Sequence, residues 1–599
     1  MRNSIFFTLL VTGSLAASAE GPTTEAPPLQ VTESPLVGLQ QVGQDTSIAT
    51  ALQDVPGVVV TTQGQPVGQA DLTIRGSSFS GAGLSIAGLS LRNPQTEHFH
   101  AELPFPASWL SQPTVLTGVA QAAHTEGHLT GTVLLSPLPM ENGGRVTAGV
   151  DNKDGYWVNS DVQRVSASEN GNQTGAGVFA GHTEIPAVDF PDNDVRATRG
   201  GGRAQILTEH GQGDLWIGHQ DKTFGARGYY GVSDSLKAEE RTQDTLLLGS
   251  WRTQDTAEPF SASFALRQFE DDYKLWLPTS LYRNQHRART AAAQTSKTFA
   301  LQERVDLVTR LAADIEDIDS NSLGDFNRSR LAATLLPEID LTDRLVLSTG
   351  VRGVLLEGHP DPLLPLARLA LAATDTLDLH VGYSQSVRRP SYTELNYESP
   401  GSLGNAGLEL QEQTSWEAGG DWRPDAHTRL QAVVFQRKTY DTVDWVRPAA
   451  ATRWQAENIG RVDTLGTEII ASRNLNDAFS ATTSYMWLDK DAEDPPYSSR
   501  YTLDYARHFV RAQLDWTLSD WLRFELSQWW REQADNPLRT DGGNEQWLTN
   551  AAVHLRCPDL PGVQFSLMAS NATDDEYRVF PGQNTVSARR LSAAVTVDW

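Results

Sequence analysis

The chain has 599 residues and a formal net charge of −26, from 48 Lys and Arg against 74 Asp and Glu. This excess of carboxylates repels phosphate backbones and excludes nucleic acid as a partner. The mean hydropathy of −0.38 excludes a protein that crosses a membrane with many helices, because each such helix needs roughly 20 nearly continuous apolar residues. A transmembrane β-barrel stays compatible with these values, because only alternate residues of its strands face lipid.

The amino end has the pattern of a secretion signal. Arg2 gives a short basic start, residues 5–11 form an apolar run, and residues 17–19 (ASA) provide a small-residue cleavage site. We therefore assign residues 1–19 to a signal peptide. The single cysteine, Cys557, excludes an internal disulfide and is expected to be a packed residue, not a nucleophile.

Residues 20–35 are rich in Pro, Thr and Glu and cannot bury a core, so they predict a flexible arm. The arm contains one short segment with strand-forming residues. It is either plain linker or a motif that adds a strand to the sheet edge of a partner. The residues of this candidate motif are Leu29, Gln30, Val31, Thr32 and Glu33.

The region from 36 to 140 predicts short strands separated by turns. Residues 58–60 follow a Pro-Gly turn, and residues 71–76 alternate before ending on a glycine. Residues 45–52 predict a short helix with Asp45 as its N-cap.

From residue 141 to the end, apolar and polar residues alternate in segments of about ten. In the last segment Leu591 and Val597 share one face, whereas Ser592 and Thr596 share the other. A soluble β-sandwich alternates too, but it usually has seven to nine strands. Because the pattern continues to the end with no helical interlude, it favours one large closed barrel over a sandwich or a β-helix.

Several motifs resemble those of one known family. Residues 55–58 and 71–76 are similar to its PGV and DLxIRG plug strands, and residues 115–118 are similar to its VLRG strand. In the second region, residues 382–395 resemble its strand-to-loop pattern FRxPxxxEL, and residues 571–577 resemble its NLFDKxY motif. In this order along the chain, these motifs resemble the TonB-dependent outer-membrane receptors.

The resemblance implies an all-β membrane protein. Residues 141–599 would form a 22-stranded antiparallel transmembrane β-barrel, and residues 36–140 an α+β plug domain inside its lumen. It also implies the outer membrane of a Gram-negative-type bacterium, with outer-membrane lipid around the wall. The barrel-assembly machinery would engage the carboxy-terminal strand that ends in Trp599.

The resemblance implies active transport without a cofactor. TonB and its inner-membrane complex would pull on the arm, with residues 29–33 as the contact. A surface lipoprotein or a periplasmic binding protein would be a further partner. An enzyme is not expected, because residues 83–88 are one residue too long for a G-x-S-x-G elbow and no GxxxxGK[ST], HExxH or CxxC motif occurs.

Within the family, residues 93–100 (NPQTEHFH), 221–230 and 319–324 resemble segments of the vitamin B12 (cobalamin) receptors. This likeness implies import of a scarce, large nutrient, with cobalamin or another corrinoid first and a siderophore or haem as the alternative. A passive outer-membrane channel and a surface β-rich adhesin are the alternatives from other classes.

The expected ligand contacts lie on one plug loop, at Arg92, Gln95, His98 and His100. The two histidines either bind a metal-bearing ligand or are ordinary polar residues of the loop. A second loop carries three carboxylates that either hold Ca²⁺ or form a solvated acidic loop, at Asp189, Asp192 and Asp194.

The resemblance also implies a contact that couples plug and barrel. Arg75 would pair with a barrel carboxylate, for which Glu394 and Glu417 are the candidates. In the family a second plug arginine shares this role, but Thr117 stands at its position here. Arg75 is therefore expected to carry the coupling from the plug side without a second plug arginine.

Overall fold

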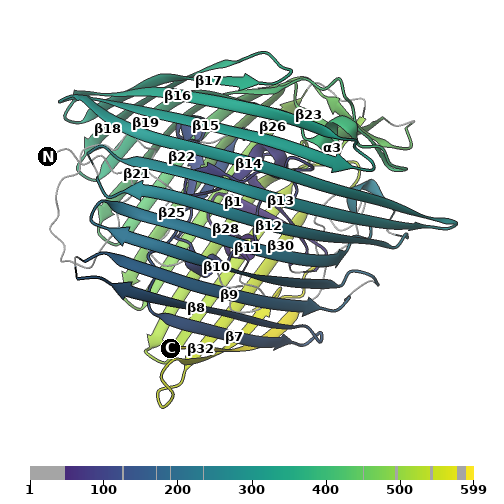
Figure 1. The fold of residues 1–599 in the computed structure, drawn as a ribbon, viewed down its shortest axis with the longest axis horizontal. Coiled ribbons are helices and arrows are strands. Elements are labelled where there is room, and N and C mark those ends of the chain that lie inside the picture. Colours follow the sequence, from purple (N-terminus) through teal and green to yellow (C-terminus); the bar gives the residue numbers. More distant parts are fainter. Residues whose placement is uncertain are drawn as a thin grey trace.

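The computed structural model describes residues 47–599, except positions 66, 125–126, 170, 189–190, 234, 256, 449–450, 493–496, 540–543 and 577–588. The predicted signal peptide and arm, including residues 29–33, lie outside the described residues. In Figure 1 the amino-terminal part of the described chain, in purple, lies inside a wall of long tilted strands. The chain thus forms a barrel with an internal domain.

The wall is a closed barrel of 22 strands, each antiparallel to its neighbours, and β32 pairs with β7 to close it. The strand number and the antiparallel arrangement confirm the prediction from sequence. The barrel strands are β7 (Gly143–Asp151), β8 (Tyr156–Ala167), β9 (Gln173–Ile185), β10 (Val195–Thr208), β11 (Gly211–Gly225), β12 (Ala238–Thr253), β13 (Phe260–Leu277), β14 (Ser280–Gln302), β15 (Val305–Ser320), β16 (Phe326–Thr342), β17 (Leu345–Leu356), β18 (Leu363–Thr374), β19 (Leu377–Arg388), β21 (Gln411–Asp425), β22 (Thr428–Tyr440), β25 (Val462–Asn476), β26 (Phe479–Ala492), β28 (Ala506–Ser519), β29 (Leu522–Gln533), β30 (Glu545–Arg556), β31 (Val563–Ser570) and β32 (Arg590–Asp598).

Alternation along each strand separates a lipid-facing side from a lumen side. In β32 the side chains of Leu591 and Val597 are exposed, whereas those of Ser592 and Thr596 are buried. The faces are those expected from the sequence. Successive side chains of a strand point to opposite sides, so each strand supplies both surfaces and the average hydropathy describes neither of them.

The two ends of the barrel differ in their connections. At one end the hairpins are tight, as between β14 and β15, and at the other end the chain forms long loops. These loops carry a small sheet in the order β20-β24-β23-β27. We take the long-loop end as the outer end, as in other outer-membrane barrels. The loop elements are η3 (Tyr229–Gly231), α3 (Tyr392–Asn396), β20 (Ser402–Leu403), β23 (Val443–Pro448), β24 (Trp454–Asn458) and β27 (Tyr497–Ser499).

The internal domain combines a hairpin of β1 and β2 with a mixed sheet in the order β4-β3-β6-β5, where β3 and β6 are parallel. Its buried aromatic residues pack on the wall, with Trp109 at 5.3 Å from Phe179 and 5.7 Å from Trp216 between ring centroids. The elements of this plug are α1 (Ile48–Leu52), β1 (Val58–Gln63), β2 (Gln69–Ile74), η1 (Phe79–Gly81), β3 (Ala82–Ile86), β4 (Leu89–Ser90), η2 (Ala107–Trp109), β5 (Thr114–Thr117), α2 (Gly118–His124) and β6 (Gly131–Leu135).

The first plug helix is shorter than expected. Its N-cap is Ser47, whose hydroxyl accepts a hydrogen bond from the Thr50 amide at 3.2 Å, so the prediction of Asp45 as the cap was wrong. Serine and aspartate both suit this position, and the sequence alone did not choose between them. Among the described residues, no helix is long and apolar enough to cross a membrane.

Candidate ligand site and plug–barrel contacts

An open cavity lies where the plug loop, the inner wall and the outer loops meet, with about 700 Å³ of empty space that includes solvent at its mouth. The plug, the wall and the outer loops all contribute side chains to it, and most of these residues are far apart in the sequence. The cavity is lined by Phe79, Gln95, Thr96, His98, Tyr230, Glu240, Asp271, Tyr273, Asn284, His286, Ser391, Thr393, Glu394, Tyr397, Ser402, Trp445, Trp454, Arg500 and Tyr501.

Aromatic rings dominate the wall of this cavity. The His98 ring stacks on Phe79 with centroids 3.8 Å apart, and Tyr501 meets Phe79 edge-on at 5.0 Å. The Arg500 guanidinium lies over Trp454 and Tyr501, at 5.4 and 5.3 Å from their centroids. Such rings offer large, stiff, partly polar contact surfaces for a bulky ligand.

Two of the four expected ligand residues, Gln95 and His98, line this cavity. The His98 Nδ1 atom lies 2.8 Å from Asp71 Oδ1, which orients the ring within the plug. Gln95 Nε2 donates to Asp271 Oδ2 on β13 at 2.6 Å. Both side chains thus connect the plug loop to the surroundings of the cavity.

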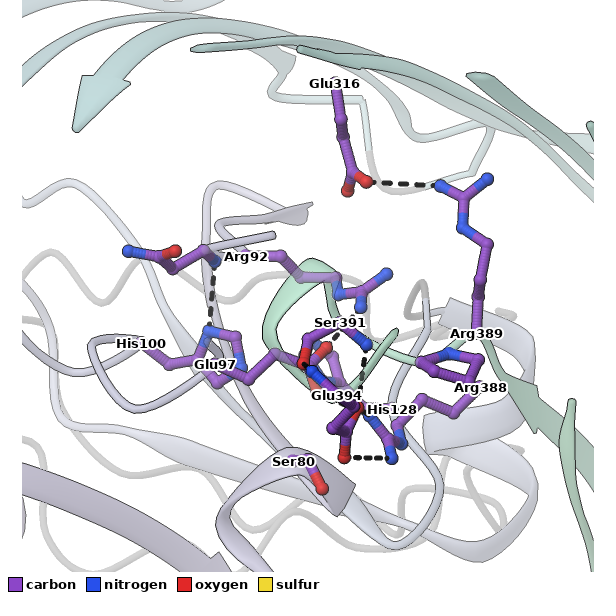
Figure 2. A network of polar contacts seen from close by, with 12 residues as sticks. Ser80, Arg92, Glu97, His100, His128, Glu316, Arg388, Arg389, Ser391 and Glu394 are labelled. Carbon is purple, nitrogen blue, oxygen red and sulfur yellow. Dashed lines mark hydrogen bonds and ion pairs between the residues drawn. The ribbon is translucent and has the colours of Figure 1, made fainter. Parts of the chain in front are cut away.

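The other two, Arg92 and His100, are not among the residues that line this cavity, and the structure places them in a buried polar network, part of which Figure 2 shows. Arg92 forms an ion pair with Glu97 of the same loop, and His100 Nδ1 accepts the Asn93 amide at 3.3 Å. Their positions therefore do not support a contact with a ligand in this cavity.

His100 lies edge-on to His128, with ring centroids 5.5 Å apart. Burial, followed by the charge of Arg92, lowers the pKa of the His100 ring well below its ordinary value of 6.5. Burial and the neighbouring His100 lower the pKa of the His128 ring in the same way. Both rings are therefore neutral at neutral pH.

The plug loop is clamped by the segment that follows β19. The Arg388 guanidinium, fully buried, donates to Glu97 Oε2 of the plug at 2.6 Å and to Glu394 Oε1 at 2.9 Å, in the network of Figure 2. The backbone amides of Tyr392 and Thr393 donate to the carbonyls at positions 94 and 95, at 3.1 and 2.8 Å. We call the contacts of residues 388–394 with residues 92–97 the outer clamp.

Glu394 belongs to this outer clamp, so its expected pairing with Arg75 was wrong. Its carboxylate accepts the Ser391 amide and hydroxyl at 2.7 and 3.0 Å, which completes a capping box at the start of α3. The spacing of Ser391 and Glu394 is the S-x-x-E signature of such a box, a signal that the sequence offered.

Arg75 joins the plug to the wall deeper in the lumen. Its Nη1 atom lies 3.1 Å from Glu417 Oε2, and its Nε atom lies 3.0 Å from Glu468 Oε2. All three side chains are buried, and the guanidinium stacks on Phe435 at 4.7 Å. Glu417 was an expected partner. Glu468 was not among the expected partners, because the sequence does not show that β25 lies beside the plug.

The residue that follows Thr117 lies directly against one of the wall carboxylates that pair with Arg75. Gly118 has a φ of +53°, and a Cβ atom there would lie 2.1 Å from Glu417 Oε1. An arginine of the wall also reaches this site, because Arg437 of β22 donates to the Arg75 carbonyl at 2.5 Å. We call Arg75, Glu417, Glu468 and Arg437 the inner lock.

The acidic loop is arranged for ion pairs within the protein. Asp192 pairs with Arg227 and, at 3.4 Å, with Lys237, and the hydrogen bond from Arg227 lowers the pKa of its carboxyl. Asp194 is exposed, and Asp189 lies outside the described residues. No group of three or more His, Cys, Asp or Glu suited to a metal occurs in the described part of the chain. These contacts do not favour Ca²⁺ binding, one of the two alternatives for this loop.

Two family models match the chain. The plug domain of TonB-dependent receptors matches residues 35–132, and the β-barrel of TonB-dependent receptor-like proteins matches residues 142–572. The chain belongs to the TonB-dependent receptor family. This receptor is therefore an outer-membrane transporter of a Gram-negative bacterium and not an enzyme, and its family membership implies an interaction with TonB.

Solved structures share the fold of the receptor at low sequence identity. The ferric enterobactin receptor PfeA of Pseudomonas aeruginosa, solved as a double mutant, superposes with a TM-score of 0.75 at 14% identity, covering 94% of this chain and 98% of that one. The siderophore receptor PirA of Acinetobacter baumannii gives 0.73 at 12% identity, with 92% and 96% covered. The FrpB iron transporter of Neisseria meningitidis gives 0.72 at 12% identity, with 95% and 99% covered. No curated protein matches the chain in sequence.

Proposed function

We propose that the receptor imports an iron chelate, a ferric siderophore, whose outer surface is neutral or positively charged. The observation that carries this proposal is the composition of the cavity, in which aromatic rings surround more carboxylates than cations. The receptors PfeA and PirA, which share the fold, are named for ferric enterobactin and siderophores, and these names support an iron chelate as the class of ligand.

The charges of the cavity favour this kind of chelate over a strongly anionic one. Among the described residues that line the cavity, three carry carboxylates, Glu240, Asp271 and Glu394, and Arg500 alone is an Arg or Lys. Glu394 is already neutralised by Arg388, but the other two face the cavity from β12 and β13. An anionic catecholate chelate would meet like charges there, and such contacts cost free energy in a desolvated site.

Cobalamin is the weaker candidate for a structural reason. Residues 93–100 are one of the three segments that resemble the cobalamin receptors. In that loop Glu97 and His100 serve the outer clamp and the buried network, so the motif is accounted for without a corrinoid.

The proposal is tested by equilibrium binding to the purified receptor in detergent. The ligands are ferrioxamine B, a cationic hydroxamate chelate, ferric enterobactin, a strongly anionic catecholate chelate, and cyanocobalamin. Quenching of tryptophan fluorescence reports binding, because Trp445 and Trp454 line the cavity. We expect a Kd below about 1 μM for ferrioxamine B, equivalent to about −8 kcal/mol, and weaker binding of the other two.

A matched pair of variants locates the bound chelate. Trp454→Ala removes a ring from the cavity and is expected to weaken binding about tenfold or more, in line with the loss of one aromatic contact surface. Trp422→Ala removes an exposed ring from β21 and should leave the affinity unchanged. Tight binding of cyanocobalamin, or of ferric enterobactin in preference to ferrioxamine B, would overturn the proposal.

A further inference from the structure

One corner of the cavity gathers polar groups without a hydrogen-bond partner, two of them acceptor oxygens and one a hydroxyl. Asp271 Oδ1 and Gln95 Oε1 have no partner among the described residues, and neither has the Tyr273 hydroxyl. All three side chains are more than nine-tenths buried, and all line the cavity. A buried acceptor without a donor costs free energy, so such a group in a cavity wall points to a ligand that supplies the donor.

Glu240 stands beside this corner on the neighbouring strand. In the register of β12 and β13, Glu240 lies opposite Tyr273, and Asp271 lies two positions along on the same inward face. One oxygen of each carboxylate is already engaged, because Tyr230 Oη lies 2.6 Å from Glu240 Oε2 and Gln95 Nε2 donates to Asp271 Oδ2 at 2.6 Å. The two carboxyl groups face one desolvated space and interact with each other there, so ionisation of both is costly without a cation beside them.

Aromatic rings complete the corner. Tyr230 and Tyr273 meet edge to face with centroids 5.6 Å apart, and both line the cavity. The faces of such rings attract a cation, most of all where water is excluded. We call Gln95, Tyr230, Glu240, Asp271 and Tyr273 the acidic corner.

The donor that fits these groups is an ammonium. It carries one positive charge and three N–H donors, so it can satisfy Asp271 Oδ1 and Gln95 Oε1 together and lie against a ring. A metal ion suits the corner less well, because no cluster of three His, Cys, Asp or Glu side chains is placed to hold one in the described residues. A ligand that carried a carboxylate or a phosphate into this corner would add to the repulsion between negative charges.

We propose that the acidic corner binds a protonated primary amine carried by the transported chelate, and so selects amine-bearing siderophores from others of the same class. This inference rests on the proposed function, because it names a group on that same ligand. The ammonium balances the paired carboxylates, and the aromatic wall holds the chelate body.

Two probes that differ in one group test the inference. Ferrioxamine B has a pendant primary amine, and N-acetylated ferrioxamine B is the same chelate without that charge. We expect the wild-type receptor to bind the amine form about 10- to 100-fold more tightly, as for a charge-assisted hydrogen bond to a buried carboxylate. In Glu240→Gln/Asp271→Asn the two probes should bind with equal affinity.

A control variant carries the same chemical changes on the opposite face of the same strands. Glu239 pairs with Lys274 at 2.9 Å and Asp272 pairs with Arg283 at 2.7 Å, and neither lines the cavity. Glu239→Gln/Asp272→Asn should therefore keep the preference for the amine. Heat-modified migration on gels, compared with wild type, verifies that each variant is a folded barrel.

The outcomes separate the two proposals. Equal affinity of the wild-type receptor for both probes would overturn the acidic corner and leave the siderophore proposal standing. Binding of neither probe, with or without binding of cyanocobalamin, would overturn the siderophore proposal and the corner with it. A preference that survives in Glu240→Gln/Asp271→Asn would also overturn the corner as the site of the amine.

Discussion

Arg75 is the residue on which the inner lock depends, because its guanidinium faces two buried carboxylates at once. Loss of the Arg75 charge would leave these two carboxylates buried without a counter-charge and without water, which costs free energy. The backbone of Arg75 also depends on these contacts. Its φ is +49°, a conformation that residues other than glycine adopt only where surrounding contacts hold it.

We expect Arg75→Gln to destabilise the plug by about 3 to 5 kcal/mol, the usual cost of breaking a buried ion pair from one side. Hydrogen exchange of the β2 amides, at Gln69–Ile74, measures the free energy of local opening. The control is Arg145→Gln, which breaks a pair with Asp598 whose two side chains are each 46% exposed and should cost at most about 1 kcal/mol. Equal effects of the two variants would contradict a special role for the lock.

Two buried histidines predict how the plug responds to acid. His100 and His128 stay neutral in the folded plug because their pKa values are lowered, whereas in the unfolded chain they take up protons below about pH 6.5. Their contribution to stability is thus fully present above pH 6.5 and is lost as the pH falls. The slope is about 1.4 kcal/mol per pH unit for each ring.

Burial raises the pKa of the Glu102 carboxyl, which opposes this trend at lower pH. Replacing both histidines therefore separates their contribution to the acid response from that of Glu102. His100→Gln/His128→Gln should show a smaller loss of plug protection between pH 7 and pH 5.5 than wild type, by hydrogen exchange corrected for intrinsic rates. The same loss in both proteins would assign the acid response to other groups.

At the scale of single elements, the short helix α3 and the segment before it hold the plug loop in place. The helix has five residues and could not persist by itself, because a single turn does not repay the cost of its nucleation. It is fixed by the capping box of Ser391 and Glu394 and by the backbone hydrogen bonds to positions 94 and 95. The outer clamp therefore sets where Gln95 and His98 face the cavity.

Ser391→Ala removes the cap and is expected to cost about 1 kcal/mol locally. The looser clamp should weaken ferrioxamine B binding several-fold, mainly through faster dissociation, and raise the exchange of amides in residues 92–97. Ser280→Ala, at the exposed first position of β14, is the matched control and should change neither value. An unchanged affinity in Ser391→Ala would show that the clamp does not position the ligand loop.

At the scale of the whole molecule, transport requires that the plug moves while the wall stays closed. The lumen of a barrel of 22 strands is too wide for side chains of the wall to fill, so the plug must seal it between transport events. The inner lock and the outer clamp fasten the plug at two levels. TonB is implied by the family, and residues 29–33 remain the predicted handle on which it would act.

Deletion of residues 29–33 is expected to abolish uptake of radiolabelled chelate by cells while leaving the affinity of the purified receptor unchanged. The physical reason is that binding uses the outer cavity, whereas energy enters through the arm. Deletion of residues 22–26 shortens the same arm by an equal length and should retain uptake. Normal uptake by the first deletion would contradict the assignment of the handle.

The sequence by itself determined the architecture of this receptor. Alternation with a period of two is a local property of each strand. It therefore predicts that Leu591 and Ser592 lie on opposite faces, whichever strands pair with β32. The plug strands and the aromatic carboxy terminus could be recognised in the same way, from short segments in a fixed order.

Only the tertiary structure decided the partners within that architecture. Arg75 and Glu468 are 393 positions apart, and they meet because the closed barrel brings β25 beside the plug. His98 and His100 are two positions apart, yet one lines the cavity and the other is buried in the network, because the chain between them forms a turn and not a strand. Strand register, barrel closure and loop conformation fix such contacts, and these depend on the whole chain folding together.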